Sequence, residues 1–195
     1  VRNCRDFILE GGSIDTDGLG TILTTTRCLC SPNRNGGKGK AELNDLLHQY
    51  LGADHVLWLD FGVLEGDDTD SHIDTLARMA PHDTLLYISD GGELGAQGEE
   101  LRLMARQLRS FRTAEGHPFN LVELPLPDPV YDDDGSRLPA TYANYLITPT
   151  HIFVPTYAQP MKDELAVRTL HSVFPGHIPV PVDCRAYLRQ HGSLH

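Results

Sequence analysis

The sequence predicts an α/β fold built from a repeated strand–strand–helix–strand unit. Three segments have the apolar spacing of amphipathic helices, and they begin at residues 40, 98 and 162. A strand-like run follows each helix within a few residues, and a strand or a pair of strands precedes it. The helix starts lie 58 and 64 residues apart, and such near-equal spacing favours a repeated supersecondary unit over an irregular mixed sheet.

The elements are expected in a regular order along the chain. Strand 21–25 precedes helix 40–51 and strand 55–60; strand 84–90 precedes helix 98–111 and strand 119–126; a hairpin at 145–157, turning at Thr148–Thr150, precedes helix 162–174 and strand 178–183. Each helix has a glutamate in its first turn, where the helix dipole favours it. A further strand is expected to end at Glu10, and the turn formers at 31–39, 89–95 and 126–139 predict loops.

Composition limits the functional classes. The chain has 195 residues with 40% hydrophobic and 22% charged residues, which predicts one globular domain spanning 1–195. A net charge of −11 disfavours a nucleic-acid-binding surface and is compatible with a cationic small-molecule ligand. We find no apolar run long enough to cross a membrane and no signal peptide, and the four cysteines do not form a disulfide framework. These features predict a cytoplasmic protein with free thiols and no membrane partner. A homo-oligomer stays open.

Both ends of the sequence predict a longer polypeptide. The chain begins at Val1 instead of methionine, and it stops at His195 directly after a strand-like "GSLH". The domain is therefore expected to be incomplete at both ends.

An acidic cluster, "GDDTDSHID" (66–74), surrounds one histidine with four aspartates. His72 and Asp74 are two residues apart, so in an extended segment both side chains point to the same side. Crowded carboxylates repel one another unless a cation lies among them, and a metal, a guanidinium or an amine would each serve. Gly66 precedes the acids, which does not fit a calcium loop. A polar surface loop is the alternative without a ligand.

Two further segments suggest site residues. Glu10 precedes Gly11 and Gly12, and a carboxylate beside two flexible residues is well placed to hold an imidazole or a ligand. The stretch "DTDGLG" (15–20) predicts a tight hairpin turn, because no helix follows at once and no lysine completes a phosphate-binding loop. Cys184 is interpreted as a packing residue.

Five motifs together resemble the agmatine deiminase family, which is grouped with the bacterial-type peptidylarginine deiminases. They are "LEGGSIDTDGLGTILTT" (9–25), "CLCSPNRN" (28–35), "DDTDSHIDTLAR" (67–78), "LPATYANYLI" (138–147) and "PVDCRAYLRQHGSLH" (181–195), in the order of the family and over nearly the whole chain. The resemblance implies the pentein fold, an α/β propeller of ββαβ modules around a pseudo-fivefold axis, of which this chain would hold about three.

The resemblance also implies a mechanism that needs no metal or other cofactor. In this family a cysteine attacks the guanidinium carbon, ammonia leaves, and water hydrolyses the covalent intermediate to a ureido product. His72 matches the histidine that acts as acid and then as base, and Asp74 matches the carboxylate that binds the guanidinium. Glu10 matches the glutamate that pairs with the histidine and keeps it charged, and Asp68 and Asp70 are expected to extend the negative pocket.

The chain departs from the family pattern at two points. The nucleophilic cysteine is expected one residue beyond His195, and a second guanidinium-binding aspartate belongs to an N-terminal Trp-x-Arg-Asp motif that this sequence lacks. The chain alone is therefore expected not to turn over substrate.

The predicted activity of the whole protein is hydrolysis of agmatine to N-carbamoylputrescine and ammonia, a step of putrescine and polyamine biosynthesis. Peptidyl-arginine is the nearest alternative substrate. Two other classes stay open: a non-catalytic pentein that binds guanidino or amine ligands, and a metal-dependent hydrolase using His72 with Asp67, Asp68 or Asp74.

Overall fold

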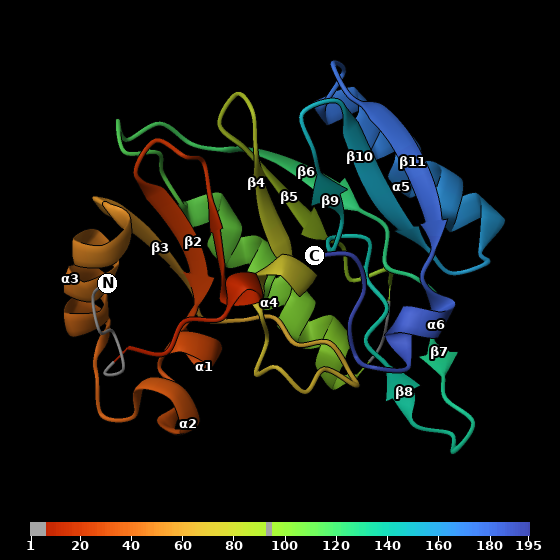
Figure 1. Cartoon of the computed structure of the whole chain (residues 1–195), viewed down its shortest axis with the longest axis horizontal. Coiled ribbons are helices and arrows are strands. Elements are labelled where there is room, and N and C mark those ends of the chain that lie inside the picture. Colours follow the sequence, from red (N-terminus) through yellow and green to blue (C-terminus); the bar gives the residue numbers. More distant parts are fainter. Residues whose placement is uncertain (1–6, 93–94) are drawn as a thin grey trace.

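Three copies of one ββαβ module make up most of the chain (Figure 1). The structure is a computed structural model, and it describes residues 7–92 and 95–195. In each module the first two strands form an antiparallel pair, and a helix then carries the chain to a third strand that pairs parallel with the second. The helix is needed because a tight turn can only reverse the chain, whereas a parallel neighbour requires a crossover.

The modules have the following bounds. Module 1 comprises β1 (Ile14–Thr16), β2 (Thr21–Thr25), α3 (Lys40–Leu51) and β3 (His55–Leu59); module 2 comprises β4 (Ala77–Ala80), β5 (Thr84–Ile88), α4 (Ala96–Ser110) and β6 (Asn120–Leu124); module 3 comprises β9 (Leu146–Ile147), β10 (His151–Thr156), α5 (Pro160–Val173) and β11 (Ile178–Asp183). Shorter elements connect them: η1 (Gly11–Ser13), α1 (Thr26–Leu29), α2 (Pro32–Asn35), η2 (Ile73–Thr75), β7 (Val130–Tyr131), β8 (Arg137–Leu138) and α6 (Arg185–Leu188).

The central strand of each sheet is covered on both faces. All five residues of β2 are buried, and successive side chains of a strand point to opposite faces. Ile22 packs with Leu43 and Leu47 of α3, whereas Leu23 belongs to the main core that all three modules share. Each fully buried leucine contributes about 1.5–3 kcal/mol relative to an exposed one. The sheets are thus held between their own helix and the neighbouring modules.

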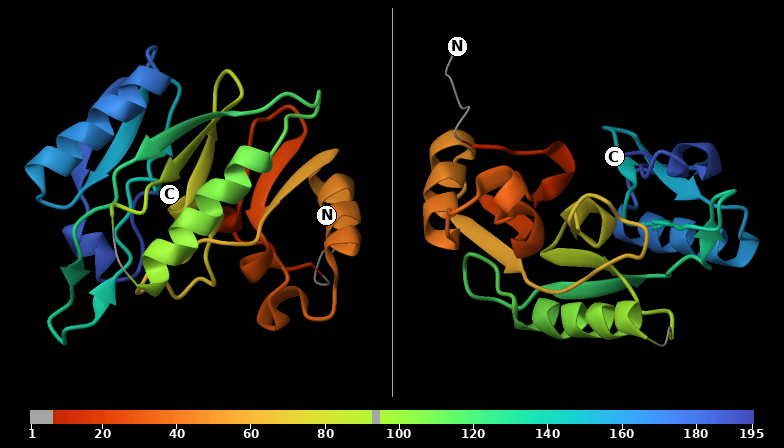
Figure 2. Two further views of the ribbon diagram at one scale, coloured as in Figure 1. Left: turned by 180° about the vertical axis from the view of Figure 1, so that it is seen from behind. Right: turned by 90° about the horizontal axis from the view of Figure 1, so that it is seen from below.

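The three long helices lie outside the sheets. In the view from below in Figure 2, α3, α4 and α5 occupy three different sides of the molecule, with the strands between them. Among the described residues, none of the helices combines the length and the apolar character that crossing a bilayer requires.

The predicted repeat is confirmed element by element. Helix 40–51 and strands 21–25 and 178–183 have the expected bounds, and α4 and α5 each begin two residues before their predicted starts. The hairpin turn at 15–20 connects β1 to β2, and the predicted hairpin of 145–157 is the β9–β10 pair. Periodicity predicted the helices because apolar residues recur on the side that packs against the core, as Leu43 and Leu47 do in α3.

Four local predictions are wrong. Residues 7–10 have no regular structure, because the chain turns into η1 there, with Ser13 N and Oγ both donating to the carbonyl of Glu10. Residues 192–195 are not a strand. The loop predicted at 31–39 contains α2, which Ser31 caps by accepting a hydrogen bond from Asn33 N. The loop predicted at 126–139 contains the β7–β8 hairpin.

Candidate active site

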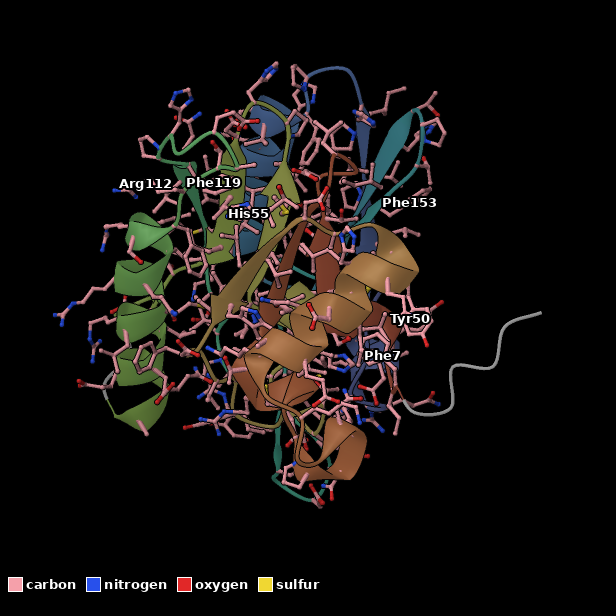
Figure 3. All side chains as sticks on the ribbon, turned by 90° about the vertical axis from the view of Figure 1, so that its left-hand side faces the viewer. Phe7, Tyr50, His55, Arg112, Phe119 and Phe153 are labelled. Carbon is pink, nitrogen blue, oxygen red and sulfur yellow. The ribbon has the colours of Figure 1, made fainter. Side chains whose placement is uncertain are left out.

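Glu10 is positioned by the segment that leads into module 1. The ring of Phe7 stacks on that of Tyr50 in α3, with centroids 6.0 Å apart (Figure 3). The side chain of Asn35 then binds the backbone of Ile8 twice: Oδ1 accepts from Ile8 N at 3.0 Å, and Nδ2 donates to Ile8 O at 3.0 Å. Since the backbone is fixed two residues earlier, the Glu10 carboxylate has a defined location.

Glu10 forms a short pair with His72. Glu10 Oε2 lies 2.5 Å from His72 Nε2, and the same oxygen accepts a hydrogen bond from Arg34 Nε at 2.9 Å. Burial opposes ionisation of Glu10, but the hydrogen bonds from His72 and Arg34 outweigh it and hold the pKa of the carboxyl below its usual value. The pair therefore combines an ionised carboxylate with an imidazole, which is the combination that general acid–base catalysis uses.

Asp67 organises the loop that carries His72. Its carboxylate accepts hydrogen bonds from Thr69 N at 3.2 Å, from Thr69 Oγ1 at 2.5 Å and from Ser71 N at 2.7 Å. Thr69 Oγ1 in turn accepts from His72 N at 3.1 Å, and Thr25 Oγ1 donates to the carbonyl of Ser71 at 2.8 Å. This aspartate of the acidic cluster thus acts on the backbone of the loop.

Asp68 and Asp70 lie at the surface of the same loop. Both are exposed, and Asp70 Oδ2 pairs with Arg34 Nη1 at 2.6 Å. Neither is among the described residues that line the cavity beside His72. Their expected role in substrate binding stays a prediction, and the structure brings only Asp70 near the Glu10–His72 pair, through Arg34.

Asp74 is a buried carboxylate with one free oxygen. Only 3% of Asp74 is exposed. Its Oδ2 accepts a hydrogen bond from Asn144 Nδ2 at 2.9 Å and lies 3.0 Å from His195 Nδ1. Within residues 7–92 and 95–195, its Oδ1 has no hydrogen-bond partner. A buried, unpaired carboxylate oxygen is costly, which makes this atom a candidate acceptor for a donor that the described residues do not supply.

His72 and Asp74 face one common point, although the geometry differs from the prediction. The segment is not extended, because Asp74 lies in the short helix η2. His72 is the residue directly before the start of that helix. A Cβ atom added to Gly12 would lie 2.7 Å from both His72 Nδ1 and Asp74 Oδ2. The backbone of Gly12 therefore fills the space between the two side chains, and any larger residue would push them apart.

A cavity of about 140 Å³ opens beside these groups. His72 and Asp74 line it together with Asn144, His191, Ser193 and His195, among others. Figure 1 shows the C-terminal end beside η2 in the middle of the molecule. The cavity thus places the imidazole of His72 and the carboxylate of Asp74 around one space, whereas Glu10 is not among the described residues that line it.

A metal ion has one candidate position in the part of the chain that the structure describes. Donor atoms of Glu10, Cys28 and His72 lie within 4.8 Å of one another. Arg34 already neutralises Glu10, and burial, reinforced by nearby carboxylates, raises the pKa of the Cys28 thiol to about 12. A metal there would have to displace both the Arg34 contact and the thiol proton. The geometry therefore favours an acid–base pair over a metal centre.

The site is formed by the segments that lead into the first strand of each module. Glu10 precedes β1, Asp74 precedes β4, and Asn144 precedes β9, each by a few residues. Sequence reasoning found Glu10, His72 and Asp74, and the structure brings these three together. It did not find Arg34, Asn144 or His195, although each lies in a motif used for the family resemblance, and their spacing in the sequence gives no sign of a shared site.

The fold and this site define a class of protein. The chain has the mixed α/β fold of pentein-superfamily structures. Over residues 1–195 it matches the family described as Porphyromonas-type peptidyl-arginine deiminase, and it belongs to that family. Family members are deiminase hydrolases that act on guanidino C–N bonds.

Individual relatives agree with this assignment. A Vibrio parahaemolyticus protein named "Putative agmatine deiminase" is 34% identical over 211 residues, which cover 97% of this chain and 56% of that protein. A structure from Porphyromonas gingivalis, named "Putative Arginine Deiminase", superposes with a TM-score of 0.92 at 43% identity, covering 97% of this chain and 55% of that one. A substrate-bound cysteine-to-serine variant of C. jejuni agmatine deiminase gives 0.89 at 40% identity, covering 97% and 54%. The chain spans about half the length of these proteins.

Proposed function

We propose that the protein to which this chain belongs hydrolyses agmatine to N-carbamoylputrescine and ammonia. The observation that carries the proposal is that buried Asp74, whose Oδ1 has no hydrogen-bond partner among the described residues, lines the same cavity as His72, the partner of Glu10. A guanidinium group presents planar N–H donors that suit a carboxylate. Bound there, its carbon would lie beside an imidazole that can supply a proton to the departing nitrogen.

The roles of the side chains follow from their positions. Asp74 Oδ1 would bind the guanidinium, and His72 would protonate the leaving ammonia and then deprotonate the attacking water. Glu10 would orient the imidazole of His72, because its carboxylate lies 2.5 Å from Nε2. The burial of Asp74 strengthens its attraction for a cation, since the local dielectric constant is low.

The nucleophile is proposed to be a cysteine that directly follows His195 in the whole protein. His195 lines the cavity, and its Nδ1 lies 3.0 Å from Asp74, so the next residue along the chain would start at the edge of the site. Cys28 does not suit this role, because it is buried and its thiol pKa is raised to about 12. The cysteine-to-serine substitution in the substrate-bound C. jejuni structure supports a cysteine in the reaction of that relative.

Agmatine is favoured over peptidyl-arginine by the names of the relatives and by the charge of the chain. The cavity fits a guanidinium head of either substrate. The net charge of −11 suits a small dication better than a peptidyl-arginine, whose arginine side chain carries a single positive charge. We further propose that two more modules close the three seen here into a propeller, and that the enzyme acts in the cytoplasm in polyamine biosynthesis.

The test is formation of ureido product by the full-length protein from agmatine, arginine and a peptidyl-arginine, each assayed separately. Product from agmatine alone supports the proposal, and product from peptidyl-arginine alone replaces the substrate. Activity should persist in excess chelator and disappear after thiol alkylation. Loss of activity with chelator would indicate a metal-dependent hydrolase instead, and no product from any substrate would indicate a non-catalytic pentein.

A further inference from the structure

Asn144 lies in the sequence motif "LPATYANYLI" (138–147), to which the proposed chemistry gives no role. The residue is 5% exposed and lies two positions before β9. Its side-chain amide is used at both ends: Nδ2 donates to Asp74 Oδ2 at 2.9 Å, and Oδ1 accepts from the backbone N–H of His195 at 3.1 Å. Asparagine thereby links two segments that are 121 positions apart in the sequence.

We propose that Asn144 is a positioning residue that aligns Asp74 with the backbone of His195, and hence with the nucleophile that follows it. This inference rests on the proposed deiminase function. With Oδ2 of Asp74 bound by Asn144 and close to His195 Nδ1, the orientation of the carboxylate is fixed, and Oδ1 is the oxygen left without a partner among the described residues. A primary amide supplies one donor and one acceptor at this place, whereas an ionised aspartate lacks the donor and alanine lacks both.

Arg78 of β4 fixes the backbone on both sides of Asn144. Its Nη1 donates to the carbonyls of Ala143 at 3.3 Å and Tyr145 at 3.0 Å. The guanidinium centre lies 4.7 Å from the centroid of the Tyr145 ring, and Nε forms an ion pair with Asp15 Oδ2 at 3.3 Å. Arg78 is itself 5% exposed. The amide of Asn144 is therefore held from outside the cavity and does not depend on bound substrate for its orientation.

The two arms of the amide have separable effects. The Nδ2 arm orients the group that binds guanidinium, so its loss should raise KM. The Oδ1 arm holds the backbone of His195, so its loss should lower kcat. A residue that only stabilised the fold would change neither parameter in a folded variant.

Asn144→Asp in the full-length protein separates the two arms. It keeps the acceptor for His195 N and places a carboxylate against Asp74 Oδ2. We expect KM for agmatine to rise about 10- to 100-fold at pH 8, with a much smaller change in kcat. Two adjacent carboxylates share a proton as the pH falls, so the ratio of variant to wild-type KM should shrink toward pH 6. That dependence on pH is the signature of a lost donor.

Two further variants complete the experiment. Asn144→Ala removes both arms without adding charge, and it should raise KM and lower kcat at every pH. Asn44→Ala is the matched control, because it also removes a hydrogen bond to a side-chain amide. Asn44 lies on the outer helix α3 and accepts from Trp58 Nε1 at 2.9 Å. The KM and kcat of this variant should equal those of wild type. Thermal unfolding of all three variants reports whether they are folded.

The outcomes are distinguishable. A wild-type protein that forms no ureido product overturns the proposed function and this inference with it. If the wild-type protein is active and the folded Asn144→Asp and Asn144→Ala variants keep wild-type KM and kcat, the positioning role alone is wrong. The positioning role is also wrong if KM and kcat change only in variants whose melting temperature is lowered. If Asn144→Asp does not fold, the KM and kcat of Asn144→Ala test the positioning role instead.

Discussion

A single carboxylate oxygen, Oδ1 of Asp74, carries the proposed recognition. The other oxygen of this carboxylate, Oδ2, contacts Asn144 and His195, and the residue is buried. Oδ1 is therefore the oxygen of Asp74 that is left to contact a cation. A buried carboxylate without a cation is unfavourable, and a guanidinium ligand relieves that cost. At this scale, the proposed affinity would come from a carboxylate oxygen that the described residues leave without a partner.

Asp74→Asn in the full-length protein should therefore impair binding and charge stabilisation together. We expect kcat/KM for agmatine to fall about 100-fold or more, because a charge-assisted pair is replaced by a neutral contact. The melting temperature should stay close to that of wild type, since the substitution preserves volume and removes an unpaired charge. Steady-state kinetics measure the first effect and calorimetry the second; an unchanged kcat/KM would show that Asp74 does not bind the guanidinium.

The Glu10–His72 pair should show unequal contributions to turnover. His72→Ala removes the acid–base group, and we expect kcat to fall about 10²- to 10⁴-fold. Glu10→Gln keeps a polar partner for the imidazole and should cost less. Rates under saturating agmatine test this order, and a more damaging Glu10→Gln would mean that the carboxylate itself takes part in proton transfer.

Glu10 also predicts a dependence of stability on pH. Its pKa is lowered in the folded protein by His72 and Arg34, against the opposing effect of burial. A lowered folded-state pKa adds stability that is present above the unfolded value of 4.5 and is lost as the pH falls through the folded value. The melting temperature of wild type should thus exceed that of Glu10→Gln at pH 7, and the difference should shrink below pH 4.5. A constant difference across this range would contradict the assignment.

At the scale of elements, the loop 66–72 determines where His72 lies. Asp70 and Ser71 both adopt positive φ, 61° and 62°, a conformation that non-glycine residues rarely adopt unless other contacts hold it. The hydrogen bonds of Asp67 to Thr69 and Ser71 supply those contacts. The aspartates of the acidic cluster therefore differ in role. Asp67 holds the backbone of the loop, whereas Asp74 lines the cavity.

Asp67→Ala should loosen this loop and misplace His72. We expect a loss of about 1–3 kcal/mol in the free energy of unfolding, because three donors lose their acceptor, together with a lower kcat. Asp134→Ala is the matched control: Asp134 binds Ser136 N and Oγ in the β7–β8 turn in the same way, outside the site. Denaturant titration and kinetics should show reduced activity only for Asp67→Ala; equal activity of both variants would mean that His72 does not depend on the loop.

Local patterns in the sequence predicted the long elements and three site residues. Apolar patterns identified α3, β2 and β11 with their bounds, although burial differs among them: all of β2 is buried, whereas β11 is half-buried or exposed throughout. They missed α2 and the β7–β8 hairpin, which are two to four residues per element and too short to show a period. Asn144 and His195 were missed because their roles come from partners 70 and 121 positions away, and no local pattern encodes such distances.

For the whole molecule, Arg78 connects the three modules. It lies in β4 of module 2, pairs with Asp15 of module 1 and binds the backbone that leads into module 3. All of these groups are largely buried, so removing the arginine would leave Asp15 as an uncompensated charge. One side chain thus fixes the relative placement of the segments that form the site.

Arg78→Ala should lower the free energy of unfolding by about 3–5 kcal/mol, as measured by denaturant unfolding. The substitution breaks a buried ion pair, and two backbone carbonyls lose their hydrogen-bond donor. Arg168→Ala removes the exposed partner of Glu164 in α5 and should change stability by no more than about 0.5 kcal/mol. A similar small effect of both substitutions would show that Arg78 does not hold the modules together.

The order in which the chain is synthesised determines when the contacts of Asp74 can form. Asp74 leaves the ribosome 70 residues before Asn144 and 121 residues before His195. The ββαβ units are assembled largely from neighbouring segments and can form as they emerge, whereas contacts between distant segments form late. A nascent chain with two finished modules therefore has its Glu10–His72 pair, whereas the contacts of Asp74 with Asn144 and His195 form only after those two residues have emerged.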